Sequence, residues 1–152
     1  MDSLIIFGSK YLYLVAVIIF VIFFLRLSKE KRVGIFIFSI FNFLVAYFTA
    51  LLAGYLYNNP RPFVSDHITP LISHVANNGF PSDHTLLVAT IAAILYCYNR
   101  KLGFVVFAIS ILIGASRVFA GIHHWIDIAG SLGIAIVVTA LIHRLLRKRL
   151  FI

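Results

Sequence analysis

The stretch Gly79-Phe80-Pro81-Ser82-Asp83-His84-Thr85 is a polar turn between two strongly apolar runs. Its glycine and proline interrupt regular structure, while Ser82 and Asp83 are residue types that cap the start of a helix. Two further polar segments interrupt the apolar sequence: Pro60-Arg61-Pro62-Phe63 upstream, and Ser116-Arg117 with His123 and Asp127 downstream. We expect the apolar helices to bring these three polar segments together in one site.

The composition indicates an integral membrane protein. Of 152 residues, 62% are hydrophobic and 12% are charged, and the mean hydropathy is +1.03. A soluble domain carries roughly twice that share of charged residues, about 25%. The net charge of +8 does not predict nucleic-acid binding, because the basic residues form short clusters between apolar runs. Cys97 is the one cysteine, so an internal disulfide is excluded.

The apolar runs predict an all-α, polytopic membrane helix bundle of about five transmembrane helices. Lys10 is the only basic residue before the first run, so we interpret that run as a retained helix and not as a cleaved signal peptide. Without a repeat or linker, residues 1–152 are interpreted as a single domain. The five runs are Tyr11–Leu27, Val33–Tyr57, His84–Tyr98, Leu102–Ala115 and Ile126–His143.

The connection Asn58–Asp83 is long, polar and rich in proline. Connections of this length are usually functional or disordered. Its middle, Thr69–Ala76, is partly apolar, and we expect a short helix there, lying in the membrane interface. The next helix is short, so we expect Ser82 and Asp83 to cap it from the aqueous side.

The distribution of basic residues predicts the topology. With five helices the connections alternate between two sides, and one side receives only Lys10, Arg61 and Arg117. The positive-inside rule puts the other side in the cytoplasm, together with the C-terminus. All three polar segments then face outward from a plasma (inner) membrane. The cytoplasmic side receives Arg26, Lys29, Lys31, Arg32, Arg100, Lys101, Arg144, Arg147, Lys148 and Arg149.

The side chains of the polar segments suit the binding of a phosphate group. Arg61 and Arg117 offer forked donors that match phosphate oxygens and stay charged. Ser82 adds a hydroxyl donor, and Gly79 permits close backbone approach. The backbone amides of residues 83–85 open a helix and are placed to form an anion site.

Three further residues suit phosphoryl transfer. His123 and Asp127 are four positions apart, which places them on one face if the helix begins near His123. An acid that accepts from one ring nitrogen orients the imidazole and makes the other nitrogen a better nucleophile. His84 can then act as general acid towards the leaving oxygen. Together these groups predict in-line transfer through a phosphohistidine.

These motifs resemble those of the type 2 phosphatidic acid phosphatase superfamily, whose signature is Lys-x6-Arg-Pro, then Pro-Ser-Gly-His, then Ser-Arg-x5-His-x3-Asp. The third element is present in full, the second is present as Pro81-Ser82-Asp83-His84, and Arg61-Pro62 supplies the end of the first. The resemblance covers roughly residues 55–130. It implies His123, His84 and Asp127 as catalytic residues, and substrate-phosphate contacts by Arg61, Pro81, Ser82, Asp83 and Arg117.

The chain departs from that signature at two positions. Gly54 stands where the family has its lysine, and Asp83 replaces the family glycine. Asp83 either caps the helix or keeps His84 protonated. The sequence around both motifs is similar to that of the bacitracin-resistance branch, the undecaprenyl-diphosphate phosphatases of bacterial envelopes. That similarity implies removal of the terminal phosphate of a polyprenyl carrier, with no cofactor and no metal.

Several alternatives remain open at the level of sequence. The substrate is either undecaprenyl diphosphate or another lipid phosphate, such as phosphatidylglycerophosphate, phosphatidic acid or lipid A. A non-catalytic binder or transporter of lipid diphosphates is the rival from a different class. His124 is expected to be a neighbour without a chemical role, while Asp66, His67 and His74 either pack on the surface or contact a headgroup.

Overall fold

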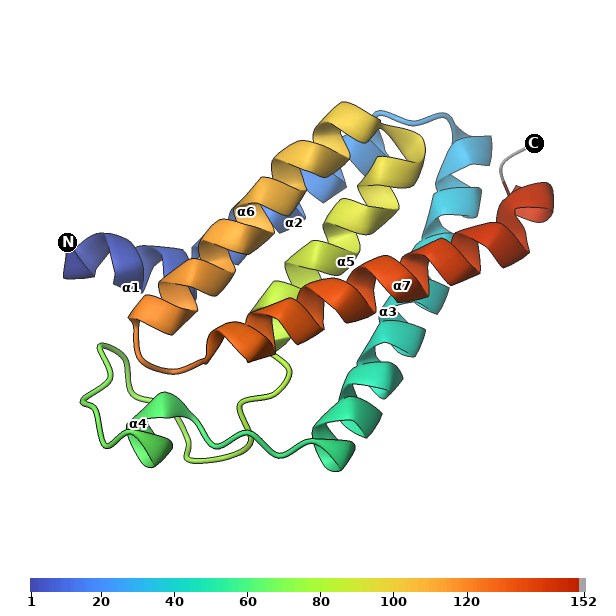
Figure 1. The fold of residues 1–152 in the computed structure, drawn as a ribbon. Helices are drawn as coiled ribbons and strands as arrows, with labels where there is room; N and C mark the ends of the chain where they lie inside the picture. Colours follow the sequence, from blue (N-terminus) through green and yellow to red (C-terminus); the bar gives the residue numbers. More distant parts are fainter. Residues whose placement is uncertain (151–152) are drawn as a thin grey trace.

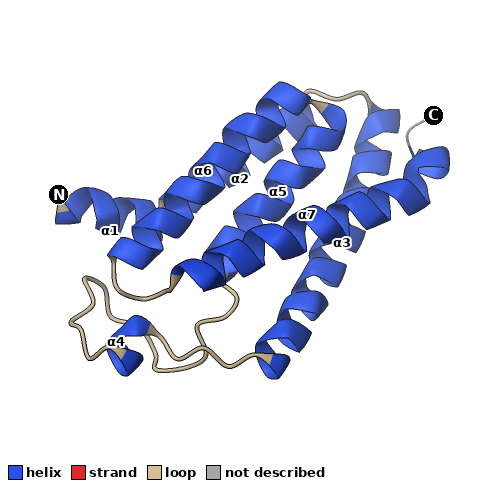
Figure 2. Cartoon of the chain, viewed as in Figure 1, coloured by secondary structure: helices blue, strands red, loops and turns tan. Residues whose placement is uncertain are grey.

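The computed structural model describes the backbone of residues 1–150 and the side chains of residues 1–146. Within this range the elements are all helices, which confirms the predicted all-α class (Figure 2). An isolated bridge between Pro60 and Asn78 is the one extended pairing in the described part. The helices are α1 (Asp2–Lys10), α2 (Leu12–Leu25), α3 (Lys29–Leu56), α4 (Pro62–Ser65), α5 (Asp83–Tyr98), α6 (Arg100–Phe119) and α7 (Trp125–Leu150).

Helix α5 lies at the centre of the bundle and packs against α2, α3, α6 and α7 (Figure 1). One cluster of buried side chains joins α5 to α3 and α7 and includes Phe38 and Ile94. A second cluster joins α5 to α2 and α6 and includes Val88 and Ile113. Because α5 is packed from several sides, its N-terminal turn has a fixed position relative to α6 and α7.

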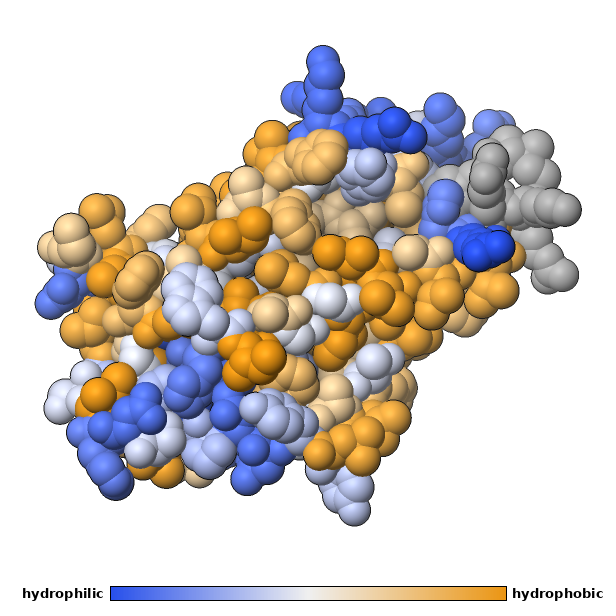
Figure 3. Space-filling model, in the orientation of Figure 1, coloured by the Kyte–Doolittle hydropathy of each residue, from blue (hydrophilic) through white to orange (hydrophobic). Residues whose placement is uncertain are grey.

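Length and hydropathy identify α3, α6 and residues 125–146 of α7 as candidate membrane spans. Helices α1 and α2 meet at an angle of 42° and qualify as a fourth span when taken together, whereas the apolar α5 is shorter. Figure 3 shows hydrophobic residues along the side of the bundle and hydrophilic residues gathered at its two ends. The chain is therefore a membrane protein, and the number of five spans stays a prediction.

The connections alternate between the two ends of the bundle, as the sequence predicts (Figure 1). The α2–α3 and α5–α6 connections lie at one end, and the long α3–α5 connection lies with the α6–α7 turn at the other. Arg61 and Arg117 meet at this second end. The assignment of Arg147, Lys148 and Arg149 to the first end falls on side chains outside the described residues.

Helical structure extends beyond the predicted apolar runs, notably at α1 and at the end of α6. Helix α1 precedes the first predicted run, has residues of mixed polarity, and packs on α6 where Gly8 faces Ser116. Helix α6 continues through Ser116 and Arg117 to Phe119. Arg117 therefore projects from the last turn of a helix, and its position is set by that helix.

Two local predictions about the long connection are wrong. Residues 69–76 form no helix, because Ile72 is buried against Ala120 and Ile122 while the N–H of Leu71 donates to the Ala120 carbonyl at 3.0 Å. Ser82 occupies the N-cap position of α5, but its side chain makes no capping hydrogen bond.

Candidate active site

His123 lies in the α6–α7 turn, is 2% exposed and faces Asp127 in the first turn of α7. Its Nδ1 lies 3.1 Å from Oδ2 of Asp127, and the same oxygen accepts the backbone N–H of His124 at 2.9 Å. The buried carboxylate selects the tautomer that carries its proton on Nδ1. The lone pair of Nε2 is then available on the opposite side of the ring.

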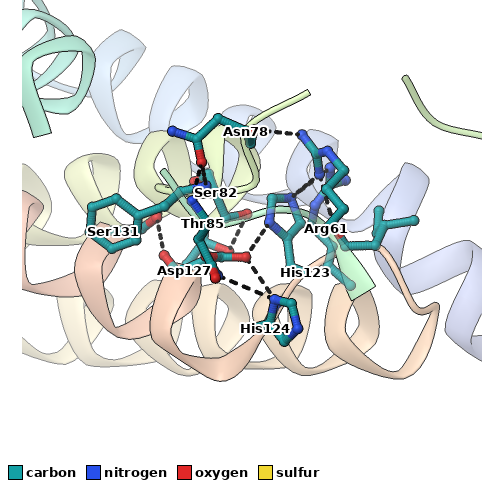
Figure 4. A network of polar contacts seen from close by, with 12 residues as sticks. Arg61, Asn78, Ser82, Thr85, His123, His124, Asp127 and Ser131 are labelled. Carbon is teal, nitrogen blue, oxygen red and sulfur yellow. Dashed lines mark hydrogen bonds and ion pairs between the residues drawn. The ribbon is translucent and has the colours of Figure 1, made fainter. Parts of the chain in front are cut away.

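That second nitrogen faces two guanidinium groups. Nε2 of His123 lies 3.1 Å from Nη1 of Arg61 (Figure 4). The same nitrogen lies 3.4 Å from Nη2 of Arg117. Burial lowers the pKa of His123, the hydrogen bond to Asp127 opposes this, and the two arginines lower the pKa further. The ring is thus held neutral, as a nucleophile requires, beside two cations that bind oxyanions.

Arg61 is 4% exposed and is held by its neighbours before any ligand arrives. Nη1 donates to the Ile122 carbonyl at 2.8 Å, and Nε donates to Oδ1 of Asn77 at 2.9 Å. Burial lowers the pKa of Arg61, and the carboxylates of Asp127 and Asp83 oppose that effect. The guanidinium is therefore preorganised, with its fork fixed between the α6–α7 turn and the long connection.

Arg117 is also 4% exposed, and the N-terminal helix holds it. Its Nη1 donates to the backbone carbonyl of Ser9, at the end of α1, at 3.1 Å. Its buried Nε has no hydrogen-bond partner among the described residues. A buried donor without a partner is costly, so this N–H is suited to a ligand that accepts hydrogen bonds.

A second set of residues, which the sequence did not single out, fixes the pair formed by His123 and Asp127. The side-chain amide of Asn59 lies 2.7 Å from Oδ1 of Asp127 and 3.2 Å from Nδ1 of His124. Asn78 accepts from the backbone of Asn59 and donates to the Gly54 carbonyl at 2.7 Å. Asparagines between prolines are typical of turns, and only their number near Arg61 hints at this network.

Gly79 lies against the site through its backbone. A Cβ atom here would come within 3.0 Å of Oδ2 of Asp127 and 3.4 Å of Cγ of Arg61. Its N–H donates to the Asn59 carbonyl at 2.8 Å. The predicted close approach therefore occurs, and it joins the long connection to Asp127.

Ser82 is fully buried at the start of α5, and its N–H donates to the backbone carbonyl of Asp127 in α7 at 3.3 Å. Its hydroxyl accepts from the hydroxyl of Thr85 at 3.2 Å, and its carbonyl accepts from Ser131 at 2.9 Å (Figure 4). Pro81 lies 3.7 Å from where a Cβ of Gly54 would stand, so it packs towards α3. No hydrogen bond joins either residue to the two arginines in the described part, and their roles as phosphate ligands stay predictions.

His84 and Asp83 open α5 at the edge of the site. His84 is partly buried, and its ring packs edge-on against Tyr13 of α2 with centroids 5.1 Å apart. Asp83 is exposed, and its carboxylate makes no capping hydrogen bond. Its negative charge raises the pKa of both Arg61 and His74, so it contributes to the field of the site.

Gly54 lies in the last turns of α3, close beneath the long connection. A Cβ at this position would stand 2.9 Å from the Phe80 carbonyl oxygen and 3.6 Å from Nδ2 of Asn78. Any side chain here would displace the backbone that carries Gly79. The absence of a lysine at position 54 therefore allows the connection to pack directly on α3.

The remaining histidines at this end differ in their surroundings. His124 is held between Asn59 and the carboxylate of Asp66, whose Oδ2 lies 3.7 Å from Nε2 of His124. His67 is exposed and adopts a positive φ of 54°. His74, by contrast, lies beside His123, with the two ring centroids 6.5 Å apart.

Known proteins share this sequence and fold. Undecaprenyl-diphosphatase BcrC of Bacillus subtilis (strain 168) is 31% identical over 147 residues, which are 95% of this chain and 74% of that protein. The bacitracin transport permease protein BcrC of Bacillus licheniformis is 26% identical over 132 residues, 86% of this chain and 64% of that protein. The chain thus spans roughly two thirds to three quarters of the length of these two relatives.

Two solved structures have the same fold. The crystal structure of Aquifex aeolicus LpxE gives a TM-score of 0.67 at 23% identity. The match covers 93% of this chain and 82% of the LpxE chain. The crystal structure of the transmembrane PAP2-type phosphatidylglycerolphosphate phosphatase of Bacillus subtilis gives a TM-score of 0.61 at 20% identity. The match covers 97% of this chain and 75% of that protein's chain. Residues 32–151 match the PAP2 superfamily. With the motifs and the fold in agreement, the chain belongs to the PAP2 superfamily.

Proposed function

We propose that the chain is an integral membrane lipid diphosphatase that removes the terminal phosphate of undecaprenyl diphosphate through a phosphohistidine. The observation that carries this proposal is the placement of Nε2 of His123 against the guanidiniums of Arg61 and Arg117, with Nδ1 on Asp127. The activity named for the Bacillus subtilis relative supports the choice of substrate. A role in recycling the envelope carrier lipid, and thereby in bacitracin resistance, belongs to the same proposal.

In the first step Nε2 of His123 attacks the terminal phosphorus. The P–N bond forms while the bond to the bridging oxygen breaks, and that oxygen leaves with its electron pair as undecaprenyl phosphate. The charge gathers on the equatorial oxygens of the transferred group, where Arg61 and Arg117 donate. The Ser82 hydroxyl accepts from Thr85 and keeps its own proton to donate to the same group.

His84 serves both steps. As an acid it gives a proton to the bridging oxygen, and as a base it then takes a proton from a water molecule. That water attacks phosphorus, the P–N bond breaks, and the electron pair returns to Nε2 of His123 as inorganic phosphate leaves. Asp127 stabilises the imidazolium that forms between the steps. We propose that the two guanidiniums make a metal ion unnecessary.

The site is proposed to face outward from the plasma membrane, with the C-terminus in the cytoplasm. The clusters of basic residues at the other end of the bundle support this orientation. Cysteine labelling tests it. In a Cys97→Ser background, Asp66→Cys should react with a membrane-impermeant maleimide on intact cells, and Lys101→Cys should react only after the cells are broken.

The activity is tested by phosphate release from detergent-purified protein with EDTA present, using undecaprenyl diphosphate and phosphatidic acid in parallel. We expect faster release from the diphosphate, its loss in His123→Ala, and no change in His67→Asn, which alters an exposed histidine. Release mainly from the monoester would keep the mechanism and change the substrate class. Activity retained by His123→Ala would contradict the mechanism.

A transporter or binder is the second candidate, because one relative is named a bacitracin transport permease. Such a protein would bind undecaprenyl diphosphate without releasing phosphate. The same assay decides between the two: folded protein that binds the lipid and releases no phosphate, in either substrate, would favour this candidate over the enzyme.

A further inference from the structure

His74 occupies an unusual place in the long connection. Its neighbours Ser73 and Val75 are exposed, whereas His74 is partly buried and turned towards the site. Its ring meets that of His123 at 73°, with the two centroids 6.5 Å apart. The charges of Arg61 and Arg117 also act on His74, so its ring lies close to His123 and within reach of the field of both guanidiniums.

The connection is anchored on both sides of this histidine. On one side Ile72 is buried against Ala120 and Ile122, and on the other Asn77 accepts from Nε of Arg61 at 2.9 Å. These anchors fix the backbone at positions 72 and 77, so His74 is held over the site by its own segment. Nδ1 of His74 lies 3.3 Å from the Val75 carbonyl. In the tautomer in which Nδ1 donates, Nε2 is the atom left for a ligand.

The charge balance of the site leaves room for another cation. Two arginines face two carboxylates, Asp127 and Asp83, so the fixed charges nearly cancel. A terminal phosphate brings about −1.5 to −2 near neutral pH. A group that gains a proton when the phosphate arrives would offset part of that charge, and an imidazole at this place can do so.

We propose that His74 is a third phosphate-binding side chain, which takes up a proton when a phosphate group enters between Arg61 and Arg117 and then donates its Nε2–H to a phosphate oxygen. The inference rests on the proposed function only in that the ligand is a phosphate in the same site. The proton comes from solvent, and no covalent bond changes.

The groups that face His74 decide the direction of its titration. Arg61, Arg117 and the ring of His123 come from the start of α4, from α6 and from the α6–α7 turn, while Asp83 and His84 come from α5. Burial, Arg61 and Arg117 lower the pKa of His74, while the Val75 carbonyl and Asp83 oppose this. A bound phosphate adds negative charge beside the ring, so binding raises this pKa.

The test compares phosphate affinity at about pH 6 and pH 8, on either side of the ordinary histidine pKa. Inorganic phosphate is titrated into detergent-purified full-length protein by calorimetry, with wild type, His74→Asn, His74→Lys and His67→Asn. The exposed His67 adopts a left-handed conformation that asparagine tolerates, so it is the matched control. The ionisation of phosphate itself is common to all four proteins and cancels in their ratios.

We expect His74→Asn to weaken phosphate binding about tenfold at pH 6, the effect of one charge-assisted hydrogen bond, and much less at pH 8. His74→Lys should bind as wild type does at pH 6 and more tightly at pH 8, because its charge persists. Equal phosphate affinity of wild type and His74→Asn at both pH values would overturn the inference. It would also be overturned if His74→Lys bound phosphate no more tightly than His74→Asn.

Turnover of undecaprenyl diphosphate is measured on the same proteins. If the wild type is active and His74→Asn has the same KM, the result counts against the role of His74 and leaves the proposed function intact. A wild type that binds phosphate in the expected pattern but never turns over would count against the proposed function and leave the role of His74 supported.

Discussion

The side-chain amide of Asn59 donates to Oδ1 of Asp127 at 2.7 Å, on the carboxylate oxygen that does not face His123. This contact fixes the rotation of the carboxylate. Asn59→Ala should therefore lower kcat by roughly tenfold to a hundredfold, the range for a hydrogen bond to a charged group, with little change in KM. Phosphate-release kinetics measure this, and a change confined to KM would contradict a positioning role.

Gly79 offers a test of the packing between the long connection and Asp127. Gly79→Ala should destabilise the protein by about 1–3 kcal/mol, because the added methyl group would meet the Asp127 carboxylate and the Asn59 carbonyl. Activity should fall with it. Gly133→Ala is the matched control, since nothing lies within 4 Å of its Cβ position. Thermal unfolding in detergent compares the two, and equal effects would refute the packing account.

The pH dependence of kcat/KM should report the neutral form of His123. Burial and the two arginines lower its pKa, so the nucleophile stays unprotonated below the ordinary histidine range. Arg61→Gln removes one cation, raises the pKa of His123 and should move the acid limb to higher pH. Lys101→Gln removes a charge at the other end of the bundle and should leave the limb in place. A downward shift in Arg61→Gln would contradict the sign of this interaction.

His84 should matter more for the second step than for the first. Undecaprenyl phosphate is a good leaving group with a second pKa near 6, so it needs little help from an acid. His84→Asn should release about one equivalent of lipid phosphate rapidly and then turn over slowly, while phosphoenzyme accumulates. Rapid quench detects this burst. If His84→Asn lost both the burst and steady-state turnover, His84 would be assigned to the first step.

The sequence predicts most of the fold because the apolar runs have the length and hydropathy of membrane helices. It misses α1, whose residues are mixed in polarity and which gains its place by packing Gly8 against Ser116. It also assigns a helix to residues 69–76, where burial of Ile72 under the α6–α7 turn decides the conformation. Tertiary contacts between distant segments cannot be read from local pattern.

The candidate site divides in the same way. Arg61, Arg117, His123 and Asp127 follow from residue type and spacing, and the structure brings them together. Asn59, Asn77 and Asn78 do not, because asparagine in a proline-rich connection is also the ordinary residue of turns. Their roles depend on which atoms the folded connection turns towards Arg61 and Asp127.

The hydrogen bond from Arg117 to the Ser9 carbonyl joins residues 108 positions apart. Because synthesis runs from the N-terminus, α1 is made long before the Arg117 that it holds, and Asp127 is made after both. A nascent chain that stops short of Trp125 therefore lacks the carboxylate that His123 faces in the folded protein.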